Sequence, residues 1–303
     1  MKKNCSVMLL GGNGFIGQNL ALHLHERGYR VSVFDLKSPQ QRLPGIQYLE
    51  GDFFDDRSID VISQGQDIVI HALSTLNPGN SNGAYMRGYT GDFVQTIKLF
   101  DQLSRTNGKL LFLSSAGTVY GRYNGTPFME SDPMRPINHY GSVKLCIETA
   151  MRAFNEQQGT RFMSCRITNP YGPGQDYRKG VGFIDAVVKS ILHDQPLEIW
   201  GDGGVVRDYI FIDDVCRIME ALINYEGKLQ TFNISTGVGT SQNEIVSLFR
   251  RLGFKVEVNY QKARTVDAQY NIASNDKVTE ATGITCCSLE EGVTRYLRYL
   301  GAL

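Results

Sequence analysis

Short apolar runs alternate with amphipathic helical patterns through the first half of the chain. The helical patterns cover residues 15–27, 92–106 and 140–157, where apolar positions recur at helical spacing. Strands that alternate with helices predict βαβ units, and such units join parallel strands through right-handed crossovers. The apolar runs that we interpret as strands are Val7–Leu10, Val31–Phe34, Ile46–Leu49, Ile68–His71, Leu110–Ser114 and Phe162–Ile167.

The second half of the chain has a different texture, with more turns and shorter apolar runs. Residues 170–179 form a loop rich in Gly and Pro, and helices are expected near 183–193, from Asp213, and at 289–300. Ser241 and Glu244 form a capping box that opens a further helix. We therefore predict an α/β fold: a doubly wound parallel sheet of the Rossmann type, covered at its carboxyl edge by a smaller mixed α/β lobe. The dinucleotide-binding domain is expected at 1–168 with returning segments near 208–235, and the substrate lobe at 169–207 and 236–303.

Composition excludes several classes of protein. The 303 residues are 42% hydrophobic, with 31 basic and 31 acidic side chains, so disorder is excluded and nothing electrostatic favours nucleic acid or an anionic membrane. No apolar run reaches the length of a membrane span, and the first residues lack the core of a signal peptide. Six scattered cysteines and five dispersed histidines predict a reduced cytoplasmic chain without a metal site.

A glycine-rich turn directly follows the first predicted strand and precedes a helix. Its glycines fit both GxGxxG (Gly12, Gly14, Gly17) and GxxGxxG (Gly11, Gly14, Gly17). In that context the turn predicts a pyrophosphate site at a helix N-terminus. Asp35 ends the second strand, where a carboxylate accepts from ribose hydroxyls and repels a 2′-phosphate, so NAD is favoured over NADP. The alternative is a structural glycine turn beside an exposed acid.

Two further segments carry candidate chemistry. Asp52 ends the third strand, where it is placed to accept from an adenine amino group with Phe53 against the ring; a solvated loop acid is the alternative. Tyr140 and Lys144 lie at i and i+4, on one face of a helix. A phenol has a pKa of about 10, and a nearby ammonium and an oxidised nicotinamide both favour the phenolate. The pair therefore predicts a proton-exchanging tyrosine.

Nearly the whole chain resembles the extended short-chain dehydrogenases/reductases, in particular the NAD-dependent sugar-nucleotide epimerase/dehydratase family and its UDP-glucose 4-epimerase-like members. The segments that carry the resemblance are Gly11–Gly17, Gly51-Asp52, His71-Ala72, Ser114–Gly121, Tyr140 with Lys144, Arg166–Gly174, Gly201–Gly203, Arg207–Tyr209, Phe232–Ser235, Arg264 with Asp267, and Ser274–Lys277.

The resemblance implies a role for each matching position. Tyr140 is implied as the acid/base, and Lys144 as its electrostatic partner and ribose ligand. A homodimer through the helices that carry Asp92 and Tyr140 is also implied. The implied substrate-binding residues are Asn169, Arg207 and Arg264, which would grip the diphosphate, against the alternative of surface arginines in ion pairs. The positions implied to hold NAD are Gly11, Gly14, Phe15, Ile16, Gly17, Asp35, Asp52, Phe53, Ala72, Leu73, Ser74, Tyr140 and Lys144.

Two positions depart from the family pattern. Ala116 stands where the family usually has a Ser or Thr that relays between substrate and base, so Ser115, Thr118 or Ser74 is expected to replace that hydroxyl. Asp92 stands where the family commonly has Asn. The same segment argues against dehydratase and decarboxylase chemistry, since Gly117-Thr118 lack the carboxylates that those reactions require.

We therefore expect an NAD-dependent nucleotide-sugar epimerase, most specifically a UDP-hexose 4-epimerase that acts through a transient 4-keto sugar. A rival is an NAD(P)H-dependent reductase of 4-keto-6-deoxy sugar nucleotides, which would use the same Tyr140 and Lys144 pair. A third reading is a catalytically silent dinucleotide-sensing protein, which the retained pair disfavours. The sugar and the nucleotide stay open at this point.

Overall fold

A parallel seven-stranded sheet forms the centre of the larger part of the molecule, with the strand order β10-β6-β5-β4-β1-β2-β3. The computed structural model describes residues 5–106, 108–122, 125–179, 182–262 and 268–303. The position of β1 in mid-sheet, with chain progression outward on both sides, is the doubly wound arrangement predicted from the sequence. The strands are β1 (Ser6–Leu10), β2 (Arg30–Asp35), β3 (Gln47–Glu50), β4 (Ile68–His71), β5 (Lys109–Ser115), β6 (Phe162–Ile167) and β10 (Thr231–Ile234).

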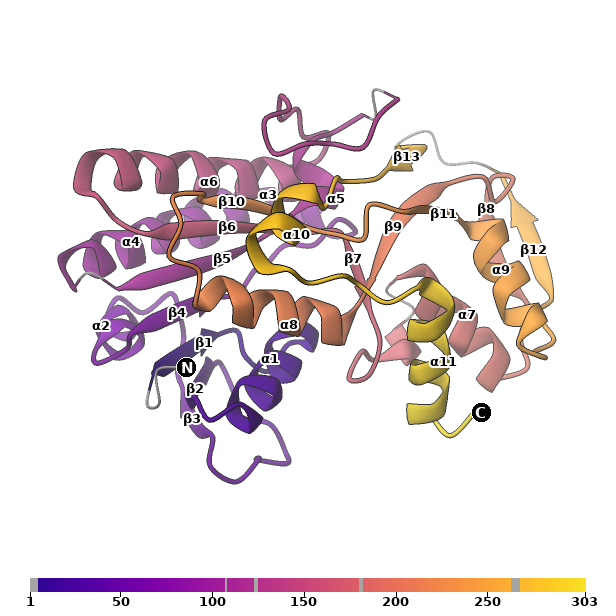
Figure 1. Cartoon of the computed structure of the whole chain (residues 1–303), viewed down its shortest axis with the longest axis horizontal. Coiled ribbons are helices and arrows are strands. Elements are labelled where there is room, and N and C mark those ends of the chain that lie inside the picture. Colours follow the sequence, from indigo (N-terminus) through magenta and orange to yellow (C-terminus); the bar gives the residue numbers. More distant parts are fainter. Residues whose placement is uncertain (1–4, 107, 123–124, 180–181, 263–267) are drawn as a thin grey trace.

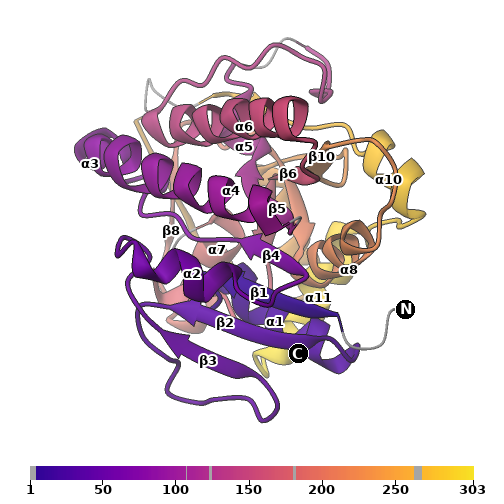
Figure 2. The same cartoon turned by 90° about the vertical axis from the view of Figure 1, so that its left-hand side faces the viewer.

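Alternate residues of each strand supply two separate cores, one on each face of the sheet. In β1, Val7 and Leu9 pack in the core under α1 (Phe15–Glu26) and α8 (Ile212–Ile223). Met8 and Leu10 face the other core. All five residues of β1 are buried because both faces of a parallel sheet are covered by helices. The helices on this second face, seen in Figures 1 and 2, are α2 (Arg57–Ser63), α4 (Val94–Thr106) and α6 (His139–Gln158).

A smaller lobe lies beyond the carboxyl ends of the strands, at the right of Figure 1. Its strands form a mixed sheet, β11-β9-β13 with β7 against β9, and a parallel β8–β12 pair. Its strands are β7 (Asn169–Tyr171), β8 (Leu197–Trp200), β9 (Val206–Phe211), β11 (Gly239–Ser241), β12 (Val258–Gln261) and β13 (Tyr270–Asn271), and its helices are η2 (Tyr177–Lys179), α7 (Phe183–Leu192), α9 (Gln242–Arg251) and α11 (Leu289–Tyr299). Helix α10 (Asp276–Thr282) packs instead against β10 and α8 of the larger part (Figure 1). The capping box of Ser241 and Glu244 is present at the start of α9. Because β9 belongs to the small sheet, the chain returns to the large sheet with α8 and β10.

The helix expected from Asp92 begins differently. A short helix, α3 (Ser81–Arg87), leads into a π-helical turn, η1 (Gly88–Phe93), and regular helix α4 starts only after it. Apolar periodicity does not signal this turn, because a π turn inserts one residue without altering the buried pattern further on. Another short helix, α5 (Ala116–Val119), follows β5 directly.

Candidate active site

The glycine-rich turn forms a tight cradle between β1 and α1. Gly11 has a φ of 77°, and a Cβ there would lie 2.8 Å from the Leu73 backbone. A Cβ on Gly17 would lie 2.6 Å from the Cα of Gly12, so the fold itself requires glycine at positions 11 and 17. Gly14 differs, because its nearest contact would be the Gly11 oxygen at an ordinary 3.4 Å. Its missing side chain leaves room beside the N-terminus of α1, as close approach of a pyrophosphate requires.

Amide groups of the first turn of α1 complete this cradle. Gly14 is the N-cap and forms no side-chain cap, so the first amides of the helix, those of Phe15 and Ile16 among them, need partners from outside the helix. The side chains of Phe15 and Ile16 pack on the core of the α1 face. The cradle therefore fits a dinucleotide diphosphate, and this chain would hold it by backbone groups.

The expected ribose ligand, Asp35, lies at the end of β2 beside the cradle. Its carboxylate accepts from the backbone N–H of Asn13 at 3.0 Å and of Leu36 at 2.8 Å. These bonds fix the carboxylate between the glycine turn and the strand end, as a ribose-binding acid requires.

The adenine end differs in one respect from the sequence prediction. Asp52 is exposed, and its carboxylate accepts from the N–H of Phe54 at 2.9 Å. The ring of Phe53, in contrast, is 2% exposed and packs edge-on against His71, with ring centroids 5.4 Å apart. The prediction that this ring lies against adenine was wrong, because it fills the core under α2 and α4 and leaves only the backbone of Phe53 for a ligand.

The loop after β4 lies directly over the cradle. Its Ala72 N–H donates to the Leu10 oxygen at 2.9 Å, which continues the sheet by one residue, and Leu73 contacts Gly11. Ser74 turns away from the cradle and donates its hydroxyl to Asp92 at 3.0 Å. This bond engages the Ser74 hydroxyl and removes Ser74 as the simplest replacement for the hydroxyl missing at Ala116.

The Tyr140 and Lys144 pair occupies the first turns of α6, whose N-cap Asn138 accepts from the N–H of Gly141 at 2.8 Å. The Lys144 side chain is buried, donates to the Leu113 oxygen of β5 at 2.8 Å and places its ammonium 4.5 Å from the Phe112 ring centroid. The same ammonium lies 5.7 Å from the Tyr140 ring centroid. Burial lowers the pKa of Lys144 to about 8, while Asp92 and Glu148 act in the opposite direction.

The pKa of Tyr140 differs from what the sequence predicts. Burial and then the Asp92 charge raise its pKa to about 12, and a hydrogen bond with Ser115 lowers it. The ammonium alone therefore does not bring the phenol toward neutral pH, since loss of hydration outweighs it in the chain by itself. The predicted lowering depends on a second positive charge, that of an oxidised nicotinamide.

Of the three candidate hydroxyls, that of Ser115 is the one that hydrogen-bonds with Tyr140. Ser115 ends β5 and interacts with Tyr140, as the shift above shows. Thr118 is 8% exposed and its hydroxyl faces the Ser115 backbone oxygen at 3.5 Å. Ala116 is fully buried in a small cluster with Tyr120 and Phe128. The hydroxyl beside the base thus comes from one residue earlier than the family pattern implies.

The expected substrate-binding residues lie on the lobe side of the site. Asn169 of β7 donates to the Asp208 backbone oxygen at 2.7 Å. Arg207, on the neighbouring strand β9, donates to the Val206 oxygen at 2.8 Å. Asp208 is fully buried and accepts from Thr236 and Gly237, although burial raises its pKa to about 6. Arg264 lies outside the described residues.

A buried charge network anchors the segment around Ser115, and the sequence pattern did not reveal it. Arg166 and Glu148 form an ion pair at 2.6 Å, with both side chains 2% exposed. Ser114 donates to Glu148, and Arg166 donates to the Tyr120 hydroxyl at 2.7 Å. The network joins β5, β6, α5 and α6, and so fixes the strand end that carries Ser115 relative to the helix that carries Tyr140.

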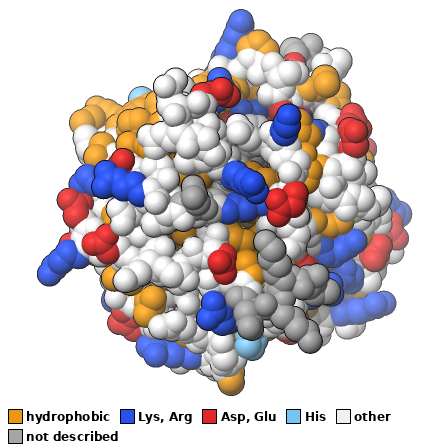
Figure 3. All heavy atoms as spheres, turned by 60° about the vertical axis from the view of Figure 1, so that its left-hand side comes forward, with side chains coloured by type: hydrophobic (Ala, Val, Ile, Leu, Met, Phe, Trp, Pro, Cys, Tyr) orange, Lys and Arg blue, Asp and Glu red, His pale blue; other side chains and the backbone are white. Residues whose placement is uncertain are grey.

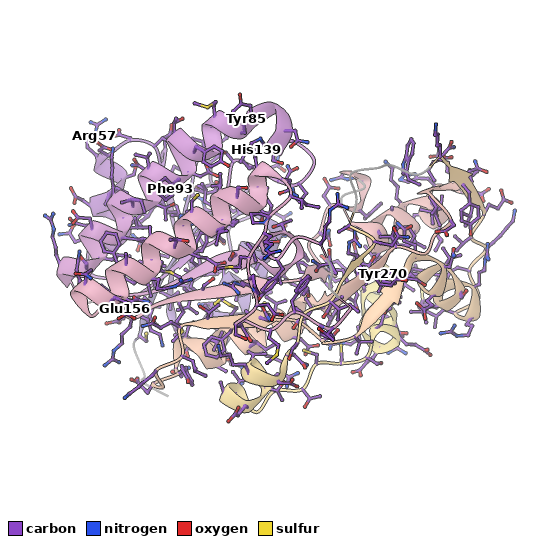
Figure 4. The ribbon with its side chains drawn as sticks, turned by 90° about the horizontal axis from the view of Figure 1, so that it is seen from above. Arg57, Tyr85, Phe93, His139, Glu156 and Tyr270 are labelled. Carbon is purple, nitrogen blue, oxygen red and sulfur yellow. The ribbon has the colours of Figure 1, made fainter. Side chains whose placement is uncertain are left out.

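The surroundings of the pair are aromatic at the start of α6. His139 stacks on Tyr85 of α3 with ring centroids 4.7 Å apart, and its Nδ1 lies 3.3 Å from the Tyr89 hydroxyl. Figure 4 shows Tyr85 and His139 together at one end of α6 and Glu156 at the other. These contacts fix the end of α6 that carries the predicted catalytic residues against α3 and η1.

A charged binding surface, a metal site and a membrane-spanning helix each require features that can be sought among the described residues. Basic and acidic side chains are interspersed over the face in Figure 3, consistent with equal numbers of the two. Within the described ranges, no cluster of three His, Cys, Asp or Glu side chains could hold a metal ion. Among those residues, no helix has the length and apolar character needed to cross a membrane.

Comparison with known proteins agrees with this geometry. A dTDP-4-dehydro-6-deoxyglucose reductase of Escherichia coli is 30% identical, over 86% of this chain and 85% of that protein. A UDP-glucose 4-epimerase of Halalkalibacterium halodurans is 27% identical, over 92% of this chain and 90% of its own length. The crystal structure of the Thermotoga maritima UDP-glucose 4-epimerase with UDP-glucose superposes with a TM-score of 0.91 at 28% identity, covering 98% of both chains. Residues 7–235 match the model of one family, and the chain belongs to it: the NAD dependent epimerase/dehydratase family.

Proposed function

We propose that this chain is an NAD-dependent nucleotide-sugar epimerase that inverts C4 of a UDP-hexose through a transient 4-keto sugar. The observation that carries the proposal is the meeting of Tyr140, Lys144 and Ser115 at the end of β5, beside a glycine cradle that fits a dinucleotide. Family membership makes NAD the cofactor, and the structural likeness to an epimerase with UDP-glucose supports the substrate.

The residues divide the chemistry between them. NAD, when bound, supplies the acceptor and donor of hydride. Tyr140 takes the proton of the 4-hydroxyl at its phenol oxygen and later returns it. Because the hydride would also return to C4, the net redox change is nil. Ser115 orients the sugar hydroxyl toward Tyr140. Lys144, anchored on the Leu113 oxygen, keeps a positive charge beside the phenol and binds the nicotinamide ribose.

The two parts of the chain divide recognition in the same way. We assign cofactor binding to the large sheet, through the glycine turn, Asp35, Asp52 and the Ala72–Ser74 loop. Asn169 and Arg207, on the lobe side, are assigned to the substrate diphosphate together with Arg264 from the sequence resemblance, since two guanidinium groups offer paired donors.

We further propose a cytoplasmic homodimer that packs through α4 and α6. All six cysteines are described and none is in a disulfide, which supports a reducing compartment. On the α3–α4 face, Met86 is 56% and Val94 is 43% exposed, and such apolar surface suits a subunit contact. Sedimentation of the purified protein tests the dimer, and a monomer at micromolar concentration would contradict it.

The decisive experiment is incubation of purified protein with UDP-glucose or UDP-galactose, with both sugars measured. Interconversion is expected without added cofactor, together with release of NAD on denaturation. Tyr140→Phe should lower kcat by at least about 100-fold, since a positioned proton donor contributes that much. Ser115→Ala, which leaves the fold intact, should lower kcat by a smaller factor. Full activity of Tyr140→Phe would contradict the assignment.

A second candidate is a 4-keto-6-deoxy sugar-nucleotide reductase, because the Escherichia coli reductase is 30% identical to this chain. Such an enzyme would use Tyr140 once, as proton donor, and consume reduced cofactor. Stoichiometric oxidation of NADH or NADPH by a dTDP-4-keto-6-deoxy sugar, without interconversion of UDP-hexoses, would favour it over the epimerase.

A further inference from the structure

A buried carboxylate lies beside the catalytic pair, and the mechanism above does not use it. Asp92 is only 3% exposed. One of its oxygens accepts from the Ser74 hydroxyl at 3.0 Å and the Thr75 N–H at 2.8 Å, and the other accepts from the Thr75 hydroxyl at 2.7 Å. In the part of the chain that the structure describes, no basic side chain lies within the 4 Å of an ion pair with it. A buried carboxylate held only by neutral donors needs compensating positive charge nearby.

The fold brings Asp92 to this position through the π-helical turn η1. Gly88, at the start of the turn, packs so closely that a Cβ would lie 2.3 Å from Leu76 and 3.0 Å from Val143. Leu76 belongs to the loop that Asp92 holds, and Val143 directly precedes Lys144. The turn is therefore wedged between the loop and the catalytic helix, with the Asp92 side chain at their junction.

The charged and titratable groups facing the pair can be named element by element. From β4, His71 packs on the ring of Phe112, and burial followed by the charge of Lys144 lowers its pKa to about 3, so it is neutral. From α6 itself, Glu148 faces Lys144, but Arg166 engages its carboxylate. From β5, Ser115 contributes a neutral hydroxyl. His139, next to Tyr140, turns to Tyr85 and Tyr89. That leaves Asp92 of η1 as the carboxylate free to balance Lys144.

We propose that Asp92 is a positioning residue for the catalytic pair, holding the Ser74–Leu76 loop and supplying the negative charge that keeps Lys144 cationic in its buried site. Loss of the charge should then make both Lys144 and Tyr140 release their protons more readily. The charge of Asp92 raises the pKa of both groups, in agreement with this sign. In the pH profile, the acid limb and the basic limb should therefore move together toward lower pH. The consequence for catalysis rests on the proposed function.

The first test uses Asp92→Asn, which keeps the shape of the side chain. Its oxygen can still accept from Ser74 and the Thr75 N–H, and its NH₂ can donate to the Thr75 hydroxyl. The matched control is Asp101→Asn on α4, which makes the same change of charge at an exposed pair with Arg105. Both limbs of the kcat/KM profile are expected about one pH unit lower in Asp92→Asn and unmoved in Asp101→Asn. Lower activity with unmoved limbs would show a structural role only and overturn the proposal.

The second test needs no substrate, so it separates this inference from the proposed epimerase activity. Acetylation of Lys144 by trace acetic anhydride, followed by peptide mass spectrometry across a pH series, reports the pKa of that amine because only the neutral form reacts. The pKa is expected about one unit lower in Asp92→Asn than in the wild type and in Asp101→Asn. Should Asp92→Asn fail to fold, Asp92→Ser gives the same comparison. An unchanged pKa of Lys144 would refute the proposal even if the enzyme proves to be an epimerase.

Discussion

Replacement of Lys144, the proposed partner of Tyr140, should make the protein without cofactor more stable. Lys144 is 3% exposed, and burial lowers its pKa from 10.5 to about 8. A lysine whose pKa is depressed by folding costs stability wherever the folded protein must hold it protonated, here below about pH 8, and costs nothing above its unfolded pKa. The shift corresponds to roughly 3 kcal/mol at pH 7.

Lys144→Met removes that cost and keeps the apolar length of the side chain. It also removes the hydrogen bond to the Leu113 oxygen, worth about 1 kcal/mol. The expected net gain is thus about 2 kcal/mol at pH 7, with activity abolished. At pH 9.5 the free-energy cost of the buried Lys144 in the wild type falls to less than half. The wild type and Lys144→Met should then have nearly equal stability.

The assay is urea unfolding of the cofactor-free protein at pH 7.0 and pH 9.5, followed by circular dichroism. Lys109→Met is the matched control, because Lys109 is also partly buried with a lowered pKa but donates to three carbonyl oxygens at the end of α8. Its loss should destabilise the protein. A Lys144→Met variant less stable than the wild type at pH 7, or a gain that does not shrink with pH, would refute this reasoning.

Two other predictions concern the lobe and the cradle. Burial raises the pKa of Asp185 from 3.8 to about 7. The folded protein therefore loses stability as pH rises from about 4 to 7, where this carboxyl ionises in the unfolded chain but stays protonated in the folded one. Asp185→Asn, which still accepts from Tyr296, should gain up to roughly 4 kcal/mol in unfolding experiments at pH 8 and nothing at pH 3.5; an equal gain at both would contradict it. Gly14→Ala should fold normally yet purify without NAD, because the added methyl group fills the space for the diphosphate. Gly17→Ala should lower the melting temperature of the cofactor-free protein, because its Cβ meets the Gly12 backbone. Equal melting temperatures of the two cofactor-free variants would show that the cradle tolerates both.

Much of the fold was accessible from local sequence because its signals are local. The β1–turn–α1 unit needs glycine at 17 because of a contact with Gly12, close by in the chain, and the i, i+4 spacing of Tyr140 and Lys144 is a property of one helix. The continuous apolar run Val7–Leu10 likewise predicts a strand buried on both faces. The short strands of the small lobe escaped prediction, because strands of two to four residues carry too few positions for a periodic pattern.

The site needed the tertiary structure wherever several elements meet. Sequence left Ser115 and Thr118 as candidates, with Ser74 as a third, and the hydrogen bond of Ser115 with Tyr140 together with the Ser74 bond to Asp92 favours Ser115. Whether Phe53 faces a ligand or the core depends on α2 and α4, which no local pattern describes.

Sequence by itself determined the parallel sheet and the dinucleotide turn, and it nominated Tyr140 as the proton-exchanging residue, because each depends on residues close together in the chain. Only the tertiary structure decided how those groups titrate. The pKa of Tyr140 and Lys144 depends on burial between β5 and α6 and on Asp92 from a separate turn. The pKa of a buried group depends on the hydration and the charges of all its neighbours in space, and the order of residues in the chain does not specify those neighbours.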